Sequence, residues 1–372
     1  MEGRKQGTMA KNLLLVAHGM GVHAAGWEQE VRKKLEEVAG RYAAFQPDAT
    51  RLWNEVELQP VSYDGILSDA LAQWKANAGG VMDFVAKNKL PDAGNLDWLG
   101  VLAQQDGEFL WNSAGDVVVY RFFRLFRERI RSRVMREIAD KVFADPGRHF
   151  RDCTIVAHSL GTSVVHDSLQ VLGTAPIAGL ANALSPPNER FRSIFMLANV
   201  SRLIESDVEA FRSIVRGGSQ NDTKSYCTRF HSFRHELDPF CVLKPFTPPP
   251  ADFDPQFNLI RQLSHYRAMD IHGFEHYLDH PRVHVPLINS ACGVDRITPD
   301  ERDAALAGYA KFDGMFAAVP EIQASVQELR TQIGRLGAGA DLGTLLDAAL
   351  HVRRIVDEIR KRIDQLHIDL DL

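Results

Sequence analysis

The sequence has few cysteines, no long apolar run and no excess of positive charge. Four cysteines in 372 residues are too few for the disulfide framework of a small secreted domain. Cys153, Cys227 and Cys241 lie in or beside apolar segments, where we expect buried, reduced thiols. No apolar run approaches the roughly 18 residues that cross a bilayer, and the N-terminus lacks the apolar core of a secretory signal. We therefore expect a cytoplasmic protein without a transmembrane segment.

The charge balance is slightly acidic. Lysine and arginine number 43 against 48 aspartates and glutamates, a net charge of −5, so no basic surface for a nucleic-acid partner is indicated. The stretch RFFRLFRERIRSRVMRE (121–137) interleaves arginines with apolar residues at helical spacing. It predicts a helix with a solvated basic face; docking of an acidic partner or a membrane is the alternative.

Short apolar runs alternate with longer amphipathic stretches, which predicts an α/β fold with a mostly parallel central sheet flanked by helices. The helix expected after the first strand, within 26–42, would bury Val31, Leu35 and Val38 on one face. The expected strands are 12–19, 57–63, 115–122, 153–159, 192–200, 226–236 and 266–272.

Two segments depart from this alternation. Residues 68–114 are apolar but broken by glycine and proline, which suggests a helical insertion folded over the sheet, either a lid or a fixed cover. From 299 to 372 apolar residues recur at spacings of four and three, with GAGADLG (337–343) between two helical patterns. We expect a body at 10–298 and a C-terminal helical hairpin at 299–372. The hairpin would pack on the body or form a homodimer contact.

The segment TIVAHSLGTSVV (154–165) places Ser159 between a β-branched run and an amphipathic stretch. A nucleophilic serine on a sharp strand-to-helix turn needs small residues on both sides, because strand and helix pass close together there. Ala157 and Gly161 occupy those two positions, with His158 directly before the serine. The alternative is a serine that only caps a helix.

A second turn, in VAHGMGVHAAGW (16–27), also follows a strand. An oxyanion in acyl transfer needs two backbone N–H groups, one after the nucleophile and one from a glycine-loosened loop. Leu160 would supply the first and Met20 the second, with His18 and Gly19 shaping the turn. A simple tight turn or a phosphate-cradling loop is the alternative, although the glycine spacing and lysine of a phosphate loop are missing.

Together, the segments VAHGMGVHAAGW, GDVVVYRF, TIVAHSLGTSVVHDSL and FRHELDPF resemble the lipase/esterase branch of the α/β-hydrolase superfamily. The resemblance covers roughly residues 12–285, without the insertion. It implies an α/β-hydrolase fold and a catalytic acid after a late strand, which falls on Asp238. The histidine would follow the last strand, in the order serine, acid, histidine. Glu236 is the alternative acid, less favoured because Pro239 marks Asp238 as the turn residue.

The base is one of four histidines in DIHGFEHYLDHPRVHVPL (270–287). His272 is favoured because it closes the last expected strand, whereas His276 has a neighbouring aromatic residue, Tyr277, as in many members of the family. The regular spacing of His272, His276, His280 and His284 also fits one face of a zinc-binding helix. Pro281 interrupts that helix, so we expect no metal and no cofactor.

The expected function is hydrolysis of carboxylic esters through an acyl-enzyme on Ser159. The apolar insertion and the proline-rich 244–257 favour acyl or lipid-type substrates. An amidase or thioesterase would use the same groups. A non-catalytic binding or scaffold protein is the alternative of another class, since a fold does not guarantee activity.

Overall fold

The fold is described from a computed structural model of the whole chain. The description covers residues 11–19, 23, 25–63, 65–67, 69, 120, 124–174, 190–202, 210–219, 221–222, 224–236, 238–242, 244–249, 253–264, 272–317, 320, 324, 327–328 and 331.

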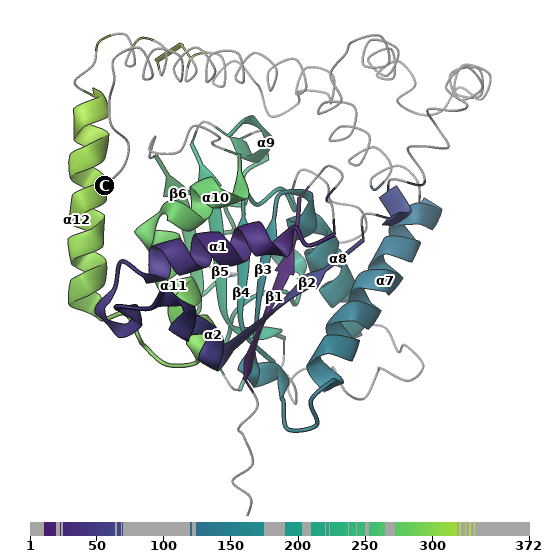
Figure 1. Cartoon of the computed structure of the whole chain (residues 1–372). Helices are drawn as coiled ribbons and strands as arrows, with labels where there is room; N and C mark the ends of the chain where they lie inside the picture. The colour runs from purple at the N-terminus through teal and green to yellow at the C-terminus, as the bar shows by residue number, and fades with distance from the viewer. Residues whose placement is uncertain are drawn as a thin grey trace, which may run out of the picture.

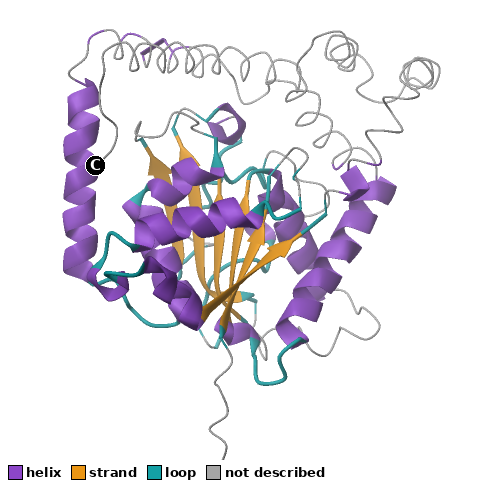
Figure 2. Cartoon of the chain, viewed as in Figure 1, coloured by secondary structure: helices purple, strands orange, loops and turns teal. Residues whose placement is uncertain are grey.

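A single six-stranded sheet, parallel throughout, forms the centre of the described part (Figure 2). Its order is β2-β1-β3-β4-β5-β6, and every neighbouring pair is parallel. The order reverses between β1 and β3, because the chain first adds a strand on one side of β1 and then continues on the other. The strands are β1 Asn12–Ala17, β2 Val56–Val61, β3 Cys153–His158, β4 Phe191–Leu197, β5 Cys227–His235 and β6 Asn258–Leu263.

Helices cover both faces of the sheet (Figure 1). Parallel strands are joined by right-handed crossovers, so the reversal in strand order puts the helices that follow β1 and β3 on opposite faces. One layer contains α1 Glu28–Ala39, α10 Phe274–Asp279 and α11 Pro281–Cys292; the other contains α7 Arg124–Phe143 and α8 Leu160–Thr174. The other helices in the described part are the short α2 Leu52–Glu55 and α9 Pro239–Val242 and the long α12 Pro299–Ala317.

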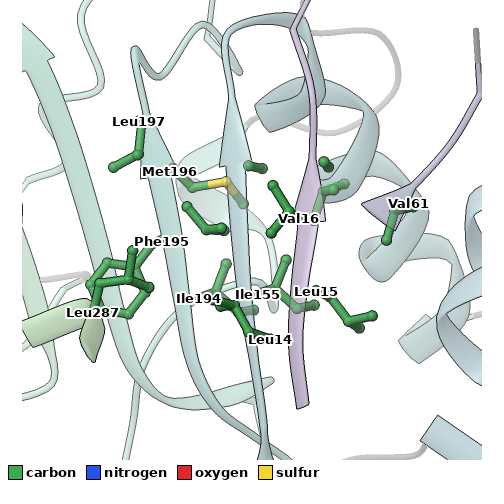
Figure 3. Close-up of a cluster of buried hydrophobic side chains, with 14 of the residues drawn as sticks. Leu14, Leu15, Val16, Val61, Ile155, Ile194, Phe195, Met196, Leu197 and Leu287 are labelled. Carbon is green, nitrogen blue, oxygen red and sulfur yellow. The ribbon is translucent and has the colours of Figure 1, made fainter. Parts of the chain in front are cut away.

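The core follows from this two-sided cover. A parallel strand that is buried on both faces must be apolar at nearly every position, and Leu13 to Ala17 of β1 are all at most 1% exposed. Every residue of β3 is buried as well. Side chains from β1, β3 and β4 form one cluster, in which Leu287 of α11 lies beside Phe195 of β4 (Figure 3). The central strands therefore look like short unbroken apolar runs in the sequence.

The two outer strands of the described sheet are less apolar. β2 contains Pro60, which lacks a backbone N–H and is tolerated at an edge. β6 carries the exposed Arg261 and Gln262, and charge at an edge discourages pairing with another chain.

The predicted α/β architecture with a parallel sheet and flanking helices is present. The strands expected at 12–19, 57–63, 153–159, 192–200 and 226–236 correspond to β1, β2, β3, β4 and β5. The strand at 258–263 was not expected, because an edge strand carries polar residues and so lacks the continuous apolar run by which the other strands were predicted. Of 115–122 only Tyr120 is described, and it is helical rather than extended. The expected strand at 266–272 lies outside the described residues except for His272, which is in a turn.

The arginine-rich helix corresponds to α7, but its predicted solvated basic face is only partly correct. Arg127 and Arg131 are 7% and 4% exposed. The Arg131 guanidinium lies 2.8 Å from the Asp167 carboxylate on α8, which also accepts a hydrogen bond from the Tyr120 hydroxyl. Since a buried charge needs a partner, the acidic residue on α8 explains why this arginine faces inwards.

Other expectations are met in part. All four cysteines are free and buried, as predicted for three of them. Of the insertion at 68–114 only Asp69 is described, and of 299–372 the structure describes α12 and a few isolated positions, so the lid, the second hairpin helix and dimerisation are outside the described residues. Within the described part, no helix is both long and apolar enough to span a bilayer.

Replacing Leu15 by alanine should lower the free energy of unfolding by about 2–5 kcal/mol, because Leu15 is 0% exposed at the centre of the sheet. The same change at Leu125, which is 73% exposed on α7, should alter it by less than about 0.5 kcal/mol. Urea denaturation of both variants measures the difference. Equal effects would contradict the assignment of the core.

Candidate functional site

Ser159 lies on a sharp turn between β3 and α8, with φ at 52°. A positive φ is uncommon for a residue with a side chain, and hydrogen bonds hold this one in place. Its N–H donates to the carbonyl of Leu197 (3.0 Å), and its carbonyl accepts from the Thr162 N–H (2.9 Å) and hydroxyl (2.6 Å). The hydroxyl is thus presented at the carboxyl end of β3 by a backbone whose polar groups are satisfied.

Two glycines allow the loop after β1 to approach this turn. A Cβ on Gly161 would collide with the carbonyl oxygen of His18 and lie 3.1 Å from that of Ala17. A Cβ on Gly19 would lie 2.8 Å from the Cβ of Ser159. The end of β1 and the start of α8 therefore meet only because neither position has a side chain.

Aromatic rings pack around His18, the first residue after β1. The His18 ring stacks on Tyr63 at 4.3 Å and lies 4.3 Å from the His23 ring, with the edge of Trp27 at 5.2 Å. The Tyr63 hydroxyl donates to the His18 carbonyl (2.6 Å), and His18 Nδ1 donates to the Gly19 carbonyl (2.8 Å).

Met20, the expected second oxyanion donor, lies outside the described residues. Leu160 is the first residue of α8, where a backbone N–H has no partner within the helix.

The structure brings Ser159, His272 and Asp238 into one line. His272 Nε2 is 2.7 Å from Ser159 Oγ, and His272 Nδ1 is 2.7 Å from Asp238 Oδ2. A carboxylate only accepts hydrogen bonds, so Nδ1 carries the proton and Nε2 offers its lone pair to the serine hydroxyl. Ser159 and Asp238 are 1% and 0% exposed, whereas the His272 side chain is 18% exposed.

Asp238 follows β5 and is held by four donors. Besides His272, its Oδ2 accepts from the Tyr277 hydroxyl and the Cys241 thiol, each at 3.2 Å, and its Oδ1 caps α9 by accepting from the Phe240 N–H at 3.1 Å. Burial by itself would raise the pKa of Asp238. The charge and hydrogen bond of His272, aided by Cys241, outweigh burial and lower this pKa below its ordinary value. The carboxylate therefore stays ionised although it is buried.

Tyr277 and Cys241 are supports that the sequence did not reveal. Burial raises the pKa of both groups well above their usual values, and the charge of Asp238 raises them further. Both therefore remain protonated and can donate to the carboxylate. The Tyr277 hydroxyl also accepts from the His235 N–H at the end of β5 (2.9 Å). From the sequence Cys241 is an ordinary buried thiol. Its position three residues after Asp238 is the one signal that could have indicated a contact with the carboxylate.

His158 supports the backbone of His272. Its Nε2 lies 2.6 Å from the His272 carbonyl oxygen, and since a carbonyl only accepts, Nε2 carries the proton. The ring stacks on Phe274 at 5.2 Å. Burial, together with the nearby His272, lowers the pKa of His158 to about 3. His158 is therefore a neutral donor that anchors the turn carrying His272.

The other candidate residues lie elsewhere. His276, on α10, is buried with its ring 5.0 Å from that of His235. His280 caps α11 by accepting from the Arg282 N–H, and His284 lies deeper in α11, where its Nε2 is 2.6 Å from the Tyr42 hydroxyl. The four histidines thus do not share one helix, because α10 ends at Asp279 and Pro281 begins α11. Of the two candidate acids, Asp238 is the one whose carboxylate contacts His272. Glu236 donates a hydrogen bond through its backbone N–H to the Leu263 carbonyl of β6.

Comparison of the chain with protein-family models, curated proteins and solved structures gave no match. Among the described residues no group of three or more histidine, cysteine, aspartate or glutamate side chains is arranged to hold a metal ion. The arrangement present can take a proton from a hydroxyl and stabilise the resulting imidazolium with a buried carboxylate.

Gly161→Ala should lower the free energy of unfolding by about 1–3 kcal/mol, because the new methyl group would collide with the carbonyl of His18, directly after β1. Gly308→Ala on α12 is the matched control, since a Cβ there meets nothing within 4 Å. It should be neutral or stabilise by up to about 1 kcal/mol through helix propensity. Thermal or urea unfolding of both variants tests this; an equally stable Gly161→Ala would contradict the close approach.

His158→Gln should make stability depend less on pH. The unfolded chain protonates this histidine near the ordinary pKa of about 6.5, but the folded protein only near pH 3. Below about pH 6.5 the unfolded state therefore binds more protons than the folded state, so the free energy of unfolding decreases as the pH is lowered. Glutamine retains a donor and does not titrate. Urea denaturation at pH 7.5 and 5 should show a smaller loss for the variant; an unchanged loss would mean that His158 is protonated in the folded protein.

Proposed function

We propose that the protein is a serine hydrolase that cleaves carboxylic esters through an acyl-enzyme on Ser159. The observation that carries this proposal is the pair of 2.7 Å hydrogen bonds that join Ser159 to His272 and His272 to Asp238. The sheet's reversal point lends further support, because ligand sites of open parallel sheets lie beyond the carboxyl ends of the strands, where the order reverses. Ser159 and His18 follow the two strands, β3 and β1, that flank this point.

In the proposed reaction His272 Nε2 removes the Ser159 proton as Oγ attacks the ester carbonyl. Asp238 holds the Nδ1–H tautomer and stabilises the imidazolium that forms. The imidazolium then protonates the departing alcohol, and the acyl group remains on Ser159. Water, deprotonated by the same nitrogen, attacks the acyl-serine. As the bond to Ser159 Oγ breaks and the acid leaves, the imidazolium gives its proton to Oγ, which restores the serine hydroxyl and neutral His272.

The negative charge on the carbonyl oxygen needs donors that are already in place. We assign one to the Leu160 N–H, at the positive end of α8, and the second to the loop after β1, with Met20 as the expected donor. Gly19 and Gly161 bring this loop against the Ser159 turn. The close approach supports the pairing of the two loops, because an oxyanion site requires both donors within hydrogen-bonding distance of one oxygen.

The proposed substrate class follows from the sequence. The apolar insertion and the proline-rich segment favour esters with an acyl or lipid-like group. Rates on a series of p-nitrophenyl esters of increasing chain length, with the matching thioesters and anilides, would rank the three chemistries. A maximum at acetyl would contradict the lipid-type assignment.

Treatment with a fluorophosphonate probe should label Ser159 in the folded protein and not after heat denaturation, because only an activated serine reacts. Peptide mass spectrometry would locate the label. Ser159→Ala should abolish labelling and lower kcat on any ester substrate by at least about 1,000-fold.

Ser168→Ala is the matched control. Ser168 is also buried in α8, but its hydroxyl donates to the Val164 carbonyl. This variant should keep both labelling and rate. Full esterase activity in Ser159→Ala, or a folded native protein that never labels with or without detergent, would overturn the proposal.

A further inference from the structure

A cavity of about 840 Å³ lies at the opposite end of the sheet from Ser159. Its floor comes from the first residues of β4, β5 and β6, such as Ser193, Arg229 and Leu259, and its walls come from α11 and α12. Ser159 and Asp238 follow the carboxyl ends of their strands, whereas this cavity opens near the amino ends. It is therefore separate from the candidate active site.

The cavity is strongly basic in a chain that is acidic as a whole. Among the described residues that line it, five are arginines and one, Asp295, is acidic. Two of the arginines have roles within the fold: Arg192 donates to the Ser290 carbonyl and to Asn12, and Arg302 pairs with Asp303. The other three are Arg229, Arg261 and Arg282, all exposed.

These three arginines have no carboxylate partner within the described part of the chain. They come from β5, β6 and α11, so the tertiary fold rather than one element brings them to the same hollow. Arg229 and Arg261 lie on the sheet face that carries His231, a face that elsewhere packs against helices. Their guanidinium groups are exposed on this face, so they are accessible to a ligand in the cavity.

His231, on the cavity floor, provides an independent observation. Its side chain is 6% exposed and stacks on Phe195 at 4.2 Å, yet its Nδ1 has no hydrogen-bond partner among the described residues. A buried polar atom left unsatisfied costs free energy. Burial, helped by Arg229, also lowers the pKa of His231 to about 3, so this ring is a neutral hydrogen-bonding group and adds no positive charge.

We infer that this cavity binds a small organic phosphate, a ligand with one phosphate group joined to an apolar body. The planar guanidinium fork matches phosphate oxygens in bidentate geometry. The volume exceeds that of a bare phosphate ion and falls in the range of small-molecule sites. Leu259, Val285, Pro286 and Leu306 supply apolar wall for the rest of the ligand.

Isothermal titration calorimetry of the full chain with hexyl phosphate tests this inference. Hexyl phosphate should bind at least about 10-fold more tightly than inorganic phosphate, and hexanol should not bind. Arg229→Gln and Arg261→Gln should each weaken binding of hexyl phosphate by about 10-fold or more. Both residues are exposed, so the variants should fold.

Arg133→Gln is the matched control, because Arg133 is 57% exposed on α7, in the helix layer on the other face of the sheet. It should bind like the unmodified protein, and Ser159→Ala should too, which separates this site from any esterase activity. The inference is overturned if folded protein does not bind hexyl phosphate, if inorganic phosphate binds equally well, or if the three arginine variants are equivalent.

Discussion

The contact between the end of β1 and the start of α8 positions the whole candidate site. Gly161 lies against the carbonyl of His18, and Gly19 lies against Ser159. Any side chain at either position would push the two loops apart. Because the two turns are in contact, Ser159 lies next to the start of the loop that we expect to stabilise an oxyanion. The positive φ of Ser159 is a strained conformation that this packing and the bonds to Leu197 and Thr162 maintain.

A second constraint is the buried charge of Asp238. A carboxylate with no exposure would normally become neutral or lower the stability of the fold. Here three side chains and one backbone N–H donate to it, and they come from α9, α10 and the turn at His272. The same bonds that keep Asp238 ionised also orient His272. His158 completes the arrangement from β3 by binding the carbonyl of His272, so four separate segments determine the position of one imidazole.

The two ends of the sheet differ in character. The carboxyl ends of β3 and β5 lead to Ser159 and Asp238, which are buried and joined through the partly exposed His272. The amino ends of β4, β5 and β6 border the arginine-lined cavity. Parallel strands make this separation natural, because all their carboxyl ends lie on one side. A ligand at the amino ends would contact β5, the strand that leads to Asp238, without reaching Ser159.

The sequence by itself determined those strands and turns that a short run of neighbouring residues specifies. Unbroken apolar runs marked β1, β3 and β4 because both of their faces are buried, and small residues around Ser159 marked a strand-to-helix turn. Tertiary structure decided what depends on neighbours distant in the chain. It selected His272 rather than His276 to lie between Ser159 and Asp238, and it brought Tyr277 and Cys241 to the carboxylate. It also buried Arg131 against Asp167 and made an edge strand of the polar segment 258–263. The type and spacing of residues in a sequence indicate which face of a helix or strand is buried. They do not indicate which distant residue a buried side chain will contact. That contact depends on how the crossover helices pack on the sheet, and it forms only when the sheet and both helix layers are assembled.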